Sequence, residues 1–241
     1  MKNGSQPDTS CREKLTLDGW LADQPADFQT DFLSIGTVKN YGQGCHLFRA
    51  GDVISHVFGL VDGQIDLHWA GPNYEELVSP SAGRRTWYGF SDAITGEEVA
   101  STAIARRSSI VYCIPRWKFI AFLQEDPERY SNIISHENRV RKDQQNVLGQ
   151  VLTLSGNSLV ANLLASMHAD EHFDHDASLQ ITQKDFAASA GVSLPTLQRA
   201  FRYLKAEGAL DVTYRGIRIL NRDNLDRLTK LDSSGDMEGL P

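Results

Sequence analysis

The side chains best suited to chemistry lie in one stretch near the C-terminal end of the sequence. Donors and acceptors there recur at helical spacing and would share one exposed face: Thr196, Gln198, Arg199, Arg202 and Lys205. Side chains of these types can read base edges in the DNA major groove or hold phosphates. The pattern predicts a DNA-binding helix, with a solvated helix face as the alternative interpretation.

The surrounding residues predict two short helices joined by a turn. Thr182 is placed to cap a first helix that ends at the Gly191 turn, and Ser193 is placed to cap a second that runs to about Glu207. Two such helices form a helix-turn-helix, whose second helix enters the major groove. The residues expected to pack the pair together are Phe186, Ala190, Val192, Leu197, Phe201 and Leu204.

A two-stranded wing is expected after the second helix. Residues 209–212 and 217–220 flank a turn at 214–216, and Arg215 gives this turn a basic tip. Segment 176–230 carries nine basic and six acidic residues, a net charge of +3, whereas the whole chain of 241 residues carries −7. The acidity therefore belongs to the other segments, where it would discourage non-specific association with DNA.

A histidine-rich stretch precedes the helix-turn-helix. His168 and His172, spaced i,i+4, could share a helix face and hold zinc together with His175 or a carboxylate. The stretch has no hydrophobic frame, so we favour the alternative of a polar connector. We predict no metal site and no bound cofactor.

The elements that position these residues begin with a β-rich block between Tyr41 and Ile114. Apolar and polar residues alternate there, with frequent turn residues. Asp62-Gly63 suits a tight turn, and we expect it to join residues 57–61 and 65–69 as a hairpin. Many short strands with glycine corners predict a sandwich, barrel or roll.

A long helix is predicted over residues 127–154. Its apolar residues recur every seven positions, as in a two-stranded coiled coil, so we interpret this face as a dimer seam. The alternative is one amphipathic helix packed on its own domain, and Ile134 and Leu148, just off the seam, could face the β-rich block. The predicted seam positions are Tyr130, Ile133, Glu137, Val140, Gln144, Val147, Val151 and Leu154.

Composition excludes several classes of protein. The chain has 41% hydrophobic and 23% charged residues, as ordinary globular proteins do, and no apolar run approaches the ~20 residues of a membrane helix. Three dispersed cysteines do not form a disulfide framework, and the N-terminus lacks a secretory signal. We therefore expect a cytoplasmic protein with no membrane partner and with loose segments at 1–19 and 231–241.

The order of these parts resembles the cyclic-AMP receptor protein/fumarate-nitrate reduction regulator (CRP/FNR) superfamily of bacterial transcription factors. The resemblance implies an α+β fold with a double-stranded β-helix (a cyclic-nucleotide-binding-like β-roll) over 20–126, a dimerisation helix over 127–154 and a winged helix-turn-helix over 155–230. It also implies a homodimer that binds a roughly palindromic operator in double-stranded DNA, and it makes RNA polymerase a candidate partner. The stretches that carry it are Val57 to Ile65, Ile181 to Ser193, Thr196 to Arg199 and Leu204 to Gly208.

The resemblance assigns roles within the DNA-binding domain. Ser193 and Thr196 match positions that hold phosphate, and Arg199 matches a base-reading arginine. Gln198 and Arg202 are additional readers or phosphate holders. Leu194 and Pro195 replace the arginine and glutamate usual early in this helix, so the family's operator sequence does not transfer. The residues expected to bind DNA are Thr182, Ser193, Thr196, Gln198, Arg199, Arg202, Lys205 and Arg215.

The sensor block departs from the family's cyclic-nucleotide pocket. The segment that matches the family's phosphate-binding cassette runs from Gly89 to Asp92. No arginine is present near Val99, where the family neutralises the cyclic phosphate. A buried anion without that partner is costly, so we expect neither cyclic AMP nor cyclic GMP to bind. A small, partly apolar effector and effector-independent regulation both stay open. The residues expected around an effector are Trp87, Gly89, Phe90, Ser91, Val99, Ala100, Asp143 and Gln144.

Two other functions fit parts of the sequence. Residues 195–201 are also similar to a helix of the arabinose-regulator type of DNA-binding protein, but here a wing ends the domain in place of a second helix-turn-helix. A cupin-like metal-dependent protein would use clustered strand histidines, a spacing that His46, His56 and His68 do not show. We therefore predict a sequence-specific transcriptional regulator and no enzymatic activity.

Overall fold

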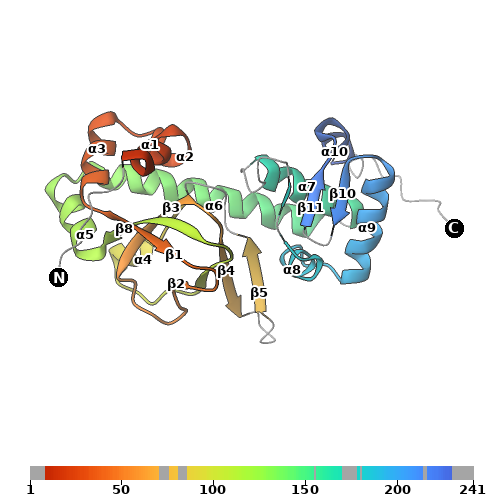
Figure 1. The fold of residues 1–241 in the computed structure, drawn as a ribbon, viewed down its shortest axis with the longest axis horizontal. Coiled ribbons are helices and arrows are strands. Elements are labelled where there is room, and N and C mark those ends of the chain that lie inside the picture. The colour runs from red at the N-terminus through yellow and green to blue at the C-terminus, as the bar shows by residue number, and fades with distance from the viewer. Residues whose placement is uncertain are drawn as a thin grey trace. The chain divides into compact units, whose positions relative to one another are not determined.

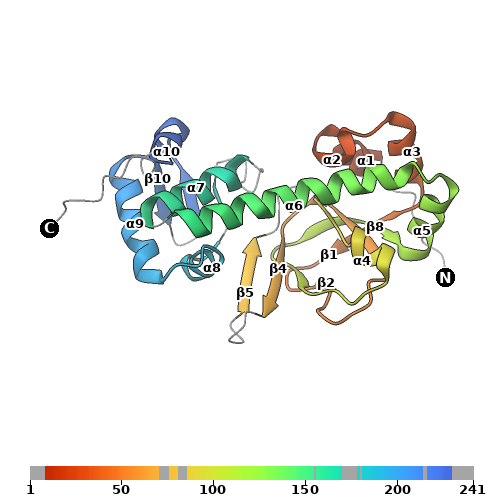
Figure 2. The same ribbon diagram turned by 180° about the vertical axis from the view of Figure 1, so that it is seen from behind.

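The computed structural model describes residues 9–70, 76–80, 86–154, 156–169, 178–179, 181–213 and 216–229. The chain divides into two compact units, one of residues 1–76 with 84–142 and one of residues 77–83 with 143–241 (Figure 1, Figure 2). Within the described ranges, no helix combines the length and the apolar character that crossing a membrane requires.

Two four-stranded sheets form a β-roll, as the sequence predicted. Their strand orders are β1-β8-β3-β6 and β2-β7-β4-β5. Strand β3 pairs antiparallel with both β8 and β6, and its residues from Val57 to Val61 are all buried. The strands are β1 (Thr37–Tyr41), β2 (His46–Phe48), β3 (His56–Asp62), β4 (Ile65–Ala70), β5 (Glu76–Pro80), β6 (Trp87–Tyr88), β7 (Thr102–Ala105) and β8 (Ser109–Pro115).

The prediction that the strands on either side of Asp62-Gly63 pair as a hairpin is wrong. Strands β3 and β4 belong to different sheets, so this corner carries the chain from one sheet to the other. Gly63 has a φ of 109°, and a Cβ at this position would overlap the side chain and backbone of Ser109. The turn chemistry is local and was predictable, whereas the strand partners are set by long-range packing.

Three helices precede the sheets: α1 (Thr9–Leu17), α2 (Gly19–Ala22) and α3 (Ala26–Ser34). The expectation of a loose arm over residues 1–19 is therefore wrong from Thr9 onward. Cys11 and Leu15 are buried in the core of the first unit, which makes α1 part of that core. Residues 1–8 and the tail at 231–241 lie outside the described residues.

An aromatic cluster joins the N-terminal helices to the cassette helix α4 (Phe90–Thr95) and to the long helix α6 (Arg129–Thr153). Trp20 of α2 packs edge-on against Trp87, Phe90 and His136, with ring-centroid distances of 6.2, 5.2 and 5.3 Å. Its indole N–H donates to the Asn132 carbonyl oxygen at 2.9 Å. The cluster thus fixes α2 and α4 against the first turns of α6.

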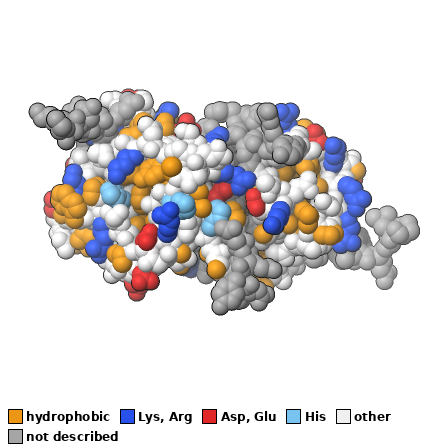
Figure 3. All heavy atoms as spheres, turned by 60° about the horizontal axis from the view of Figure 1, so that its bottom comes forward, with side chains coloured by type: hydrophobic (Ala, Val, Ile, Leu, Met, Phe, Trp, Pro, Cys, Tyr) orange, Lys and Arg blue, Asp and Glu red, His pale blue; other side chains and the backbone are white. Residues whose placement is uncertain are grey.

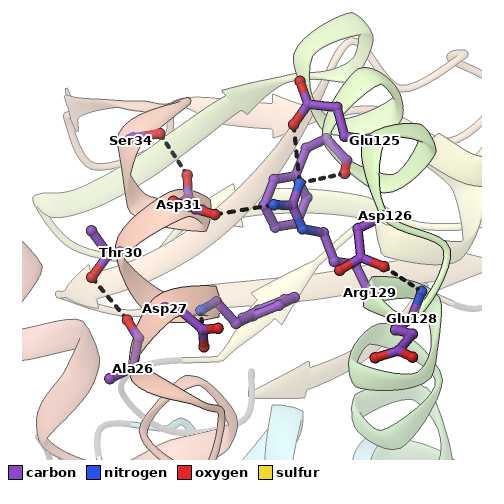
Figure 4. Close-up of polar contacts among 11 residues, drawn as sticks. Ala26, Asp27, Thr30, Asp31, Ser34, Glu125, Asp126, Glu128 and Arg129 are labelled. Carbon is purple, nitrogen blue, oxygen red and sulfur yellow. Dashed lines mark hydrogen bonds and ion pairs between the residues drawn. The ribbon is translucent and has the colours of Figure 1, made fainter.

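A single arginine fixes the start of α6. Arg129 donates to Asp31 of α3 at 3.0 Å and to Glu125 of α5 (Arg116–Glu125) at 3.1 Å, as Figure 4 shows. Its guanidinium also lies over the Phe122 ring, 4.0 Å from the centroid. The Arg129 side chain is only 16% exposed, whereas its partners Asp31 and Glu125 are 56% and 71% exposed, so water screens the two ion pairs from the carboxylate side.

The seam predicted along α6 needs correction. Four of its positions pack against cores within the chain: Tyr130, Ile133, Val151 and Leu154. Ile133 is 1% exposed and is therefore unavailable to a partner. Ile134 and Leu148, which were expected to be able to face the β-rich block, are instead 55% and 56% exposed. The most exposed apolar residues of α6, Ile134, Leu148 and Leu152, thus each lie one residue beyond a predicted seam position, whereas the predicted Val147 is 38% exposed.

The second unit contains the predicted winged helix-turn-helix. Helices α8 (Gln183–Ser189) and α9 (Leu194–Ala206) form the pair, and Thr182 and Ser193 cap them as expected. Of the residues expected to pack the pair, Val192 is partly buried and the others are buried. The remaining elements are α7 (Gly156–Ala169), β9 (Ser178–Leu179), β10 (Leu210–Thr213), β11 (Gly216–Ile219) and α10 (Arg222–Leu228).

Close packing in the roll predicts that Gly59→Ala lowers stability. The new Cβ would lie 2.8–2.9 Å from ring atoms of Trp87, so the core must shift, at a cost of about 1–3 kcal/mol. All four tryptophans lie in the first unit, so their fluorescence during urea unfolding reports on that unit. Gly42→Ala is the matched control, because its Cβ would meet only Cys45 Sγ, at an ordinary 3.7 Å. Equal unfolding midpoints for the two variants would contradict the packing argument.

Candidate nucleic-acid interface

Helix α9 separates an apolar face from a polar one. Leu197, Ala200 and Leu204 are fully buried, so that face is fixed inside the second unit. The opposite face is exposed and carries most of the residues predicted to bind DNA. Its exposed members are Leu194, Pro195, Gln198, Arg199, Arg202 and Lys205.

The start of α9 is organised by two hydroxyl groups. Ser193 Oγ accepts a hydrogen bond from the Thr196 backbone N–H at 3.3 Å and lies 2.8 Å from Thr196 Oγ1. Arg199 in turn donates to Thr196 Oγ1 at 3.4 Å. The hydroxyls expected to hold phosphate therefore also cap the helix and restrain the arginine expected to read a base.

Two residues of the same face are available for hydrogen bonding. Gln198 and Arg202 are exposed and make no hydrogen bond or ion pair with any other described residue. A free amide can pair with adenine, and a free guanidinium can pair with guanine or phosphate, without first breaking a contact inside the protein.

Lys205, also expected on the DNA face, pairs with the wing. Its Nζ lies 2.6 Å from Asp211 Oδ1 on β10. This hydrogen bond and the lysine's charge, with a smaller contribution from Arg218, hold the pKa of Asp211 below its ordinary value. Asp211 is therefore ionised at neutral pH, and it ties the end of α9 to the wing while it offsets one positive charge.

Other residues of the predicted set lie around α9. Thr182 is exposed, and its hydroxyl accepts from the Asp185 backbone N–H at 3.1 Å, so it serves as the cap of α8. Arg215, at the predicted tip of the wing, lies outside the described residues. Figure 3 shows Lys and Arg side chains gathered at the end of the second unit that α9 occupies. Sequence reasoning did not predict the pairing of Lys205 with Asp211 or the hydrogen bond from Arg199 to Thr196.

The weak metal candidates cannot be assembled from the described residues. His168 lies in α7, but its side chain is not described, and His172 and His175 lie outside the described residues. Among the residues that the structure does describe, no group of three or more His, Cys, Asp and Glu side chains could hold a metal ion.

The proposed effector residues fall into two groups. Trp87 and Phe90 are 3% and 1% exposed and stack on each other within the aromatic cluster, so their rings serve core packing. Val99 is likewise buried, and Gly89 precedes α4 with a φ of 86°. The remaining four are exposed, and their contact with an effector stays a prediction: Ser91, Ala100, Asp143 and Gln144.

The cassette region carries negative charge. Burial raises the pKa of Asp92 in α4, and the nearby Glu137 and Glu97 carboxylates raise it further. Arg116 is the arginine beside α4, but its Nε donates to the Ala93 carbonyl oxygen at 2.8 Å. An anion at this place would meet the carboxylates of Asp92, Glu97 and Glu137 close to the Arg116 guanidinium.

Comparison with known proteins places both units. The profile of the cyclic nucleotide-binding domain matches residues 38–126, and that of the Crp-like helix-turn-helix domain matches residues 160–228. The transcriptional activatory protein AadR of Rhodopseudomonas palustris (strain ATCC BAA-98 / CGA009) is 25% identical in an alignment that covers 93% of this chain and 94% of that protein.

Solved structures share the fold. FixK2 from Bradyrhizobium japonicum has a TM-score of 0.68 at 16% identity, covering 80% of this chain and 97% of that one. A putative cAMP-binding regulatory protein from Silicibacter pomeroyi DSS-3 has a TM-score of 0.66 at 19% identity, covering 92% and 100%. A β-roll followed by a helix-turn-helix is thus common to all three chains.

The Lys205–Asp211 pair predicts that Asp211→Asn strengthens non-specific DNA binding. Without the Asp211 carboxylate, the Lys205 ammonium is free to contact a DNA phosphate. One additional phosphate contact should steepen the slope of log K against log salt concentration by about one. The affinity for a random-sequence duplex is measured by fluorescence anisotropy at salt concentrations from about 50 to about 200 mM, where affinity depends steeply on salt. Asp223→Asn makes the same charge change at an exposed residue of α10 without releasing a lysine. If both variants steepen the slope equally, Lys205 is not held back by Asp211.

Proposed function

Because the chain belongs to the CRP/FNR superfamily of DNA-binding transcription regulators, we propose that it acts as a homodimer on a roughly palindromic operator. Each half-site would receive one α9 in the major groove. The observation that carries the proposal is the construction of α9, with a buried apolar face and an exposed face that presents Gln198, Arg199 and Arg202.

The exposed apolar residues of α6 support the dimer. Ile134 and Leu148 are two heptads apart, and Leu152 follows at the next seam position with 74% exposure. Val147 beside them is 38% exposed. Single exposed apolar residues are ordinary, but a set at heptad spacing along one helix is what a coiled-coil partner would cover.

Regulation would not use a cyclic nucleotide. The aromatic side chains of Trp87 and Phe90 are buried in the core, and the charges around α4 are mostly negative. We therefore propose that a small, partly apolar effector controls the protein or that it acts without an effector. The relative from R. palustris is named as an activatory protein, which favours activation of transcription and hence contact with RNA polymerase.

Arg199→Ala should abolish most sequence discrimination. A bidentate arginine–guanine contact contributes about 1–3 kcal/mol of discrimination, so the ratio of specific to non-specific affinity should fall by roughly 5- to 150-fold. The ratio is measured on a duplex selected from a randomised library and on its scrambled version, at one salt concentration. Arg227→Ala removes an arginine that pairs with Glu207, away from α9's exposed face, and should keep the ratio. An unchanged ratio in Arg199→Ala would rule out this arginine as the reader.

Leu148→Glu should convert the dimer to monomers. A carboxylate in an apolar seam loses its hydration and faces its own symmetry mate, so association becomes unfavourable. Sedimentation velocity measures the outcome, and circular dichroism checks that the monomers stay folded. Asn146→Glu adds the same charge at another exposed position of α6 and should stay dimeric. A dimeric Leu148→Glu protein would contradict the seam.

A further inference from the structure

We propose that Leu194 and Pro195 form an apolar reading tip that selects thymine in each operator half-site through its C5-methyl group. The proposal rests on the proposed function, because it assigns a base preference to the helix that is proposed to enter the major groove. It concerns the first two residues of α9.

Leu194 is the exception to the amphipathic pattern of α9. Leu197, Phe201 and Leu204 of that helix are 4% exposed or less, whereas Leu194 is 39% exposed in the first turn. Pro195 beside it is also exposed. One exposed leucine alone has no significance, but here two adjacent apolar residues begin the face that presents the polar readers.

Helical spacing places this tip beside the expected base contacts. Leu194 and Gln198 are separated by four residues, as are Pro195 and Arg199, so each pair lies on neighbouring positions of one helix face. The rise of 1.5 Å per residue separates the members of a pair by about 6 Å along the axis. That distance is about two base-pair steps of about 3.4 Å. A side chain in this position therefore meets bases close to those that Gln198 and Arg199 contact.

The backbone of the first turn offers little polar chemistry to a base. Pro195 has no N–H, and the Thr196 N–H is taken by Ser193 Oγ at 3.3 Å. The Leu197 N–H is taken by the Ser193 carbonyl oxygen at 3.0 Å. No side chain at positions 194 and 195 can accept from cytosine N4 or adenine N6, or donate to guanine O6.

What remains for direct readout is apolar contact. In the major groove, thymine is the base that presents a methyl group, and aliphatic side chains contact it there. Leu194 supplies a flexible aliphatic group and Pro195 a rigid one with no rotamer freedom to lose. We expect each half-site to carry a thymine, on either strand, within about two base pairs of the guanine read by Arg199.

The test removes single methyl groups from DNA. Full-length protein first selects duplexes from a randomised library, and each thymine of the enriched half-site is then replaced in turn by deoxyuridine, which lacks only the C5-methyl group. One replacement should weaken binding of the unaltered protein by about fourfold, the effect of one buried methyl-sized group. Leu194→Ala should show a smaller deoxyuridine effect, because it removes most of the longer of the two apolar side chains of the tip.

A control variant tests whether the methyl sensitivity depends on Leu194 or on any exposed leucine of the second unit. Leu220→Ala removes another exposed leucine of the same unit, 56% exposed beyond β11, and should keep the full deoxyuridine effect. Unchanged thermal unfolding of Leu194→Ala, expected for an exposed residue, shows that its reduced methyl sensitivity is local.

The outcomes distinguish a failure of the thymine preference from a failure of the proposed function. If an operator is enriched and depends on Arg199, but no deoxyuridine replacement matters, the thymine preference is wrong and the proposed function stands. The same holds if Leu194→Ala keeps the deoxyuridine effect. If no duplex is enriched over random DNA, sequence-specific binding itself fails, and the reading tip fails with it.

Discussion

The geometry of the face proposed to read DNA depends on the burial of the opposite face of α9. Leu197, Ala200 and Leu204 are fully buried and lie three to four residues apart, so together they fix the rotation of the helix about its axis. Successive helical residues point about 100° apart, and this rotation therefore decides that Gln198 and Arg199 face outward. Hydrophobic packing thus sets which side chains of α9 are exposed to a partner.

Contacts within the protein then divide the basic residues of this unit into different roles. Arg199 is restrained by Thr196 Oγ1, Lys205 is held by Asp211, and Arg202 has no partner among the described residues. A restrained side chain loses less conformational entropy when it binds, and a side chain without a partner adapts more easily to a phosphate. Net charge alone does not distinguish these roles, because it counts all three residues equally.

Local chemistry was predictable from the sequence, and long-range packing was not. The caps at Thr182 and Ser193 depend on residues within one turn, so reading the order of polar and apolar residues was sufficient. The corner at Gly63 was recognised, but its strands join different sheets, because pairing depends on residues that are far away in the sequence. Helix α1 was missed because its composition is polar and only Cys11 and Leu15 turn inward.

The seam on α6 shows the same limit in one helix. A seven-residue period identifies a repeating face, yet it cannot say whether Ile133 or its neighbour Ile134 points to the core. The core decides: Ile133 is buried in the first unit, and Ile134 is left exposed. A shift of one residue rotates the exposed stripe by about 100°, so tertiary packing, which the heptad pattern does not contain, decides which residues of α6 are left for the proposed partner.

The aromatic cluster gives the sensor unit a mechanical connection to α6. Trp20 contacts Phe90 of the cassette helix and His136 of α6, and Phe90 and His136 also contact each other, with ring centroids 5.0 Å apart. Close-packed rings do not deform continuously, so a displacement of α4 has to move Trp20, the first turns of α6, or both. The interaction of Arg129 with Asp31 and Glu125 resists the second of these movements at the start of α6. The cassette helix and the first turns of α6 are therefore coupled by packed aromatic side chains.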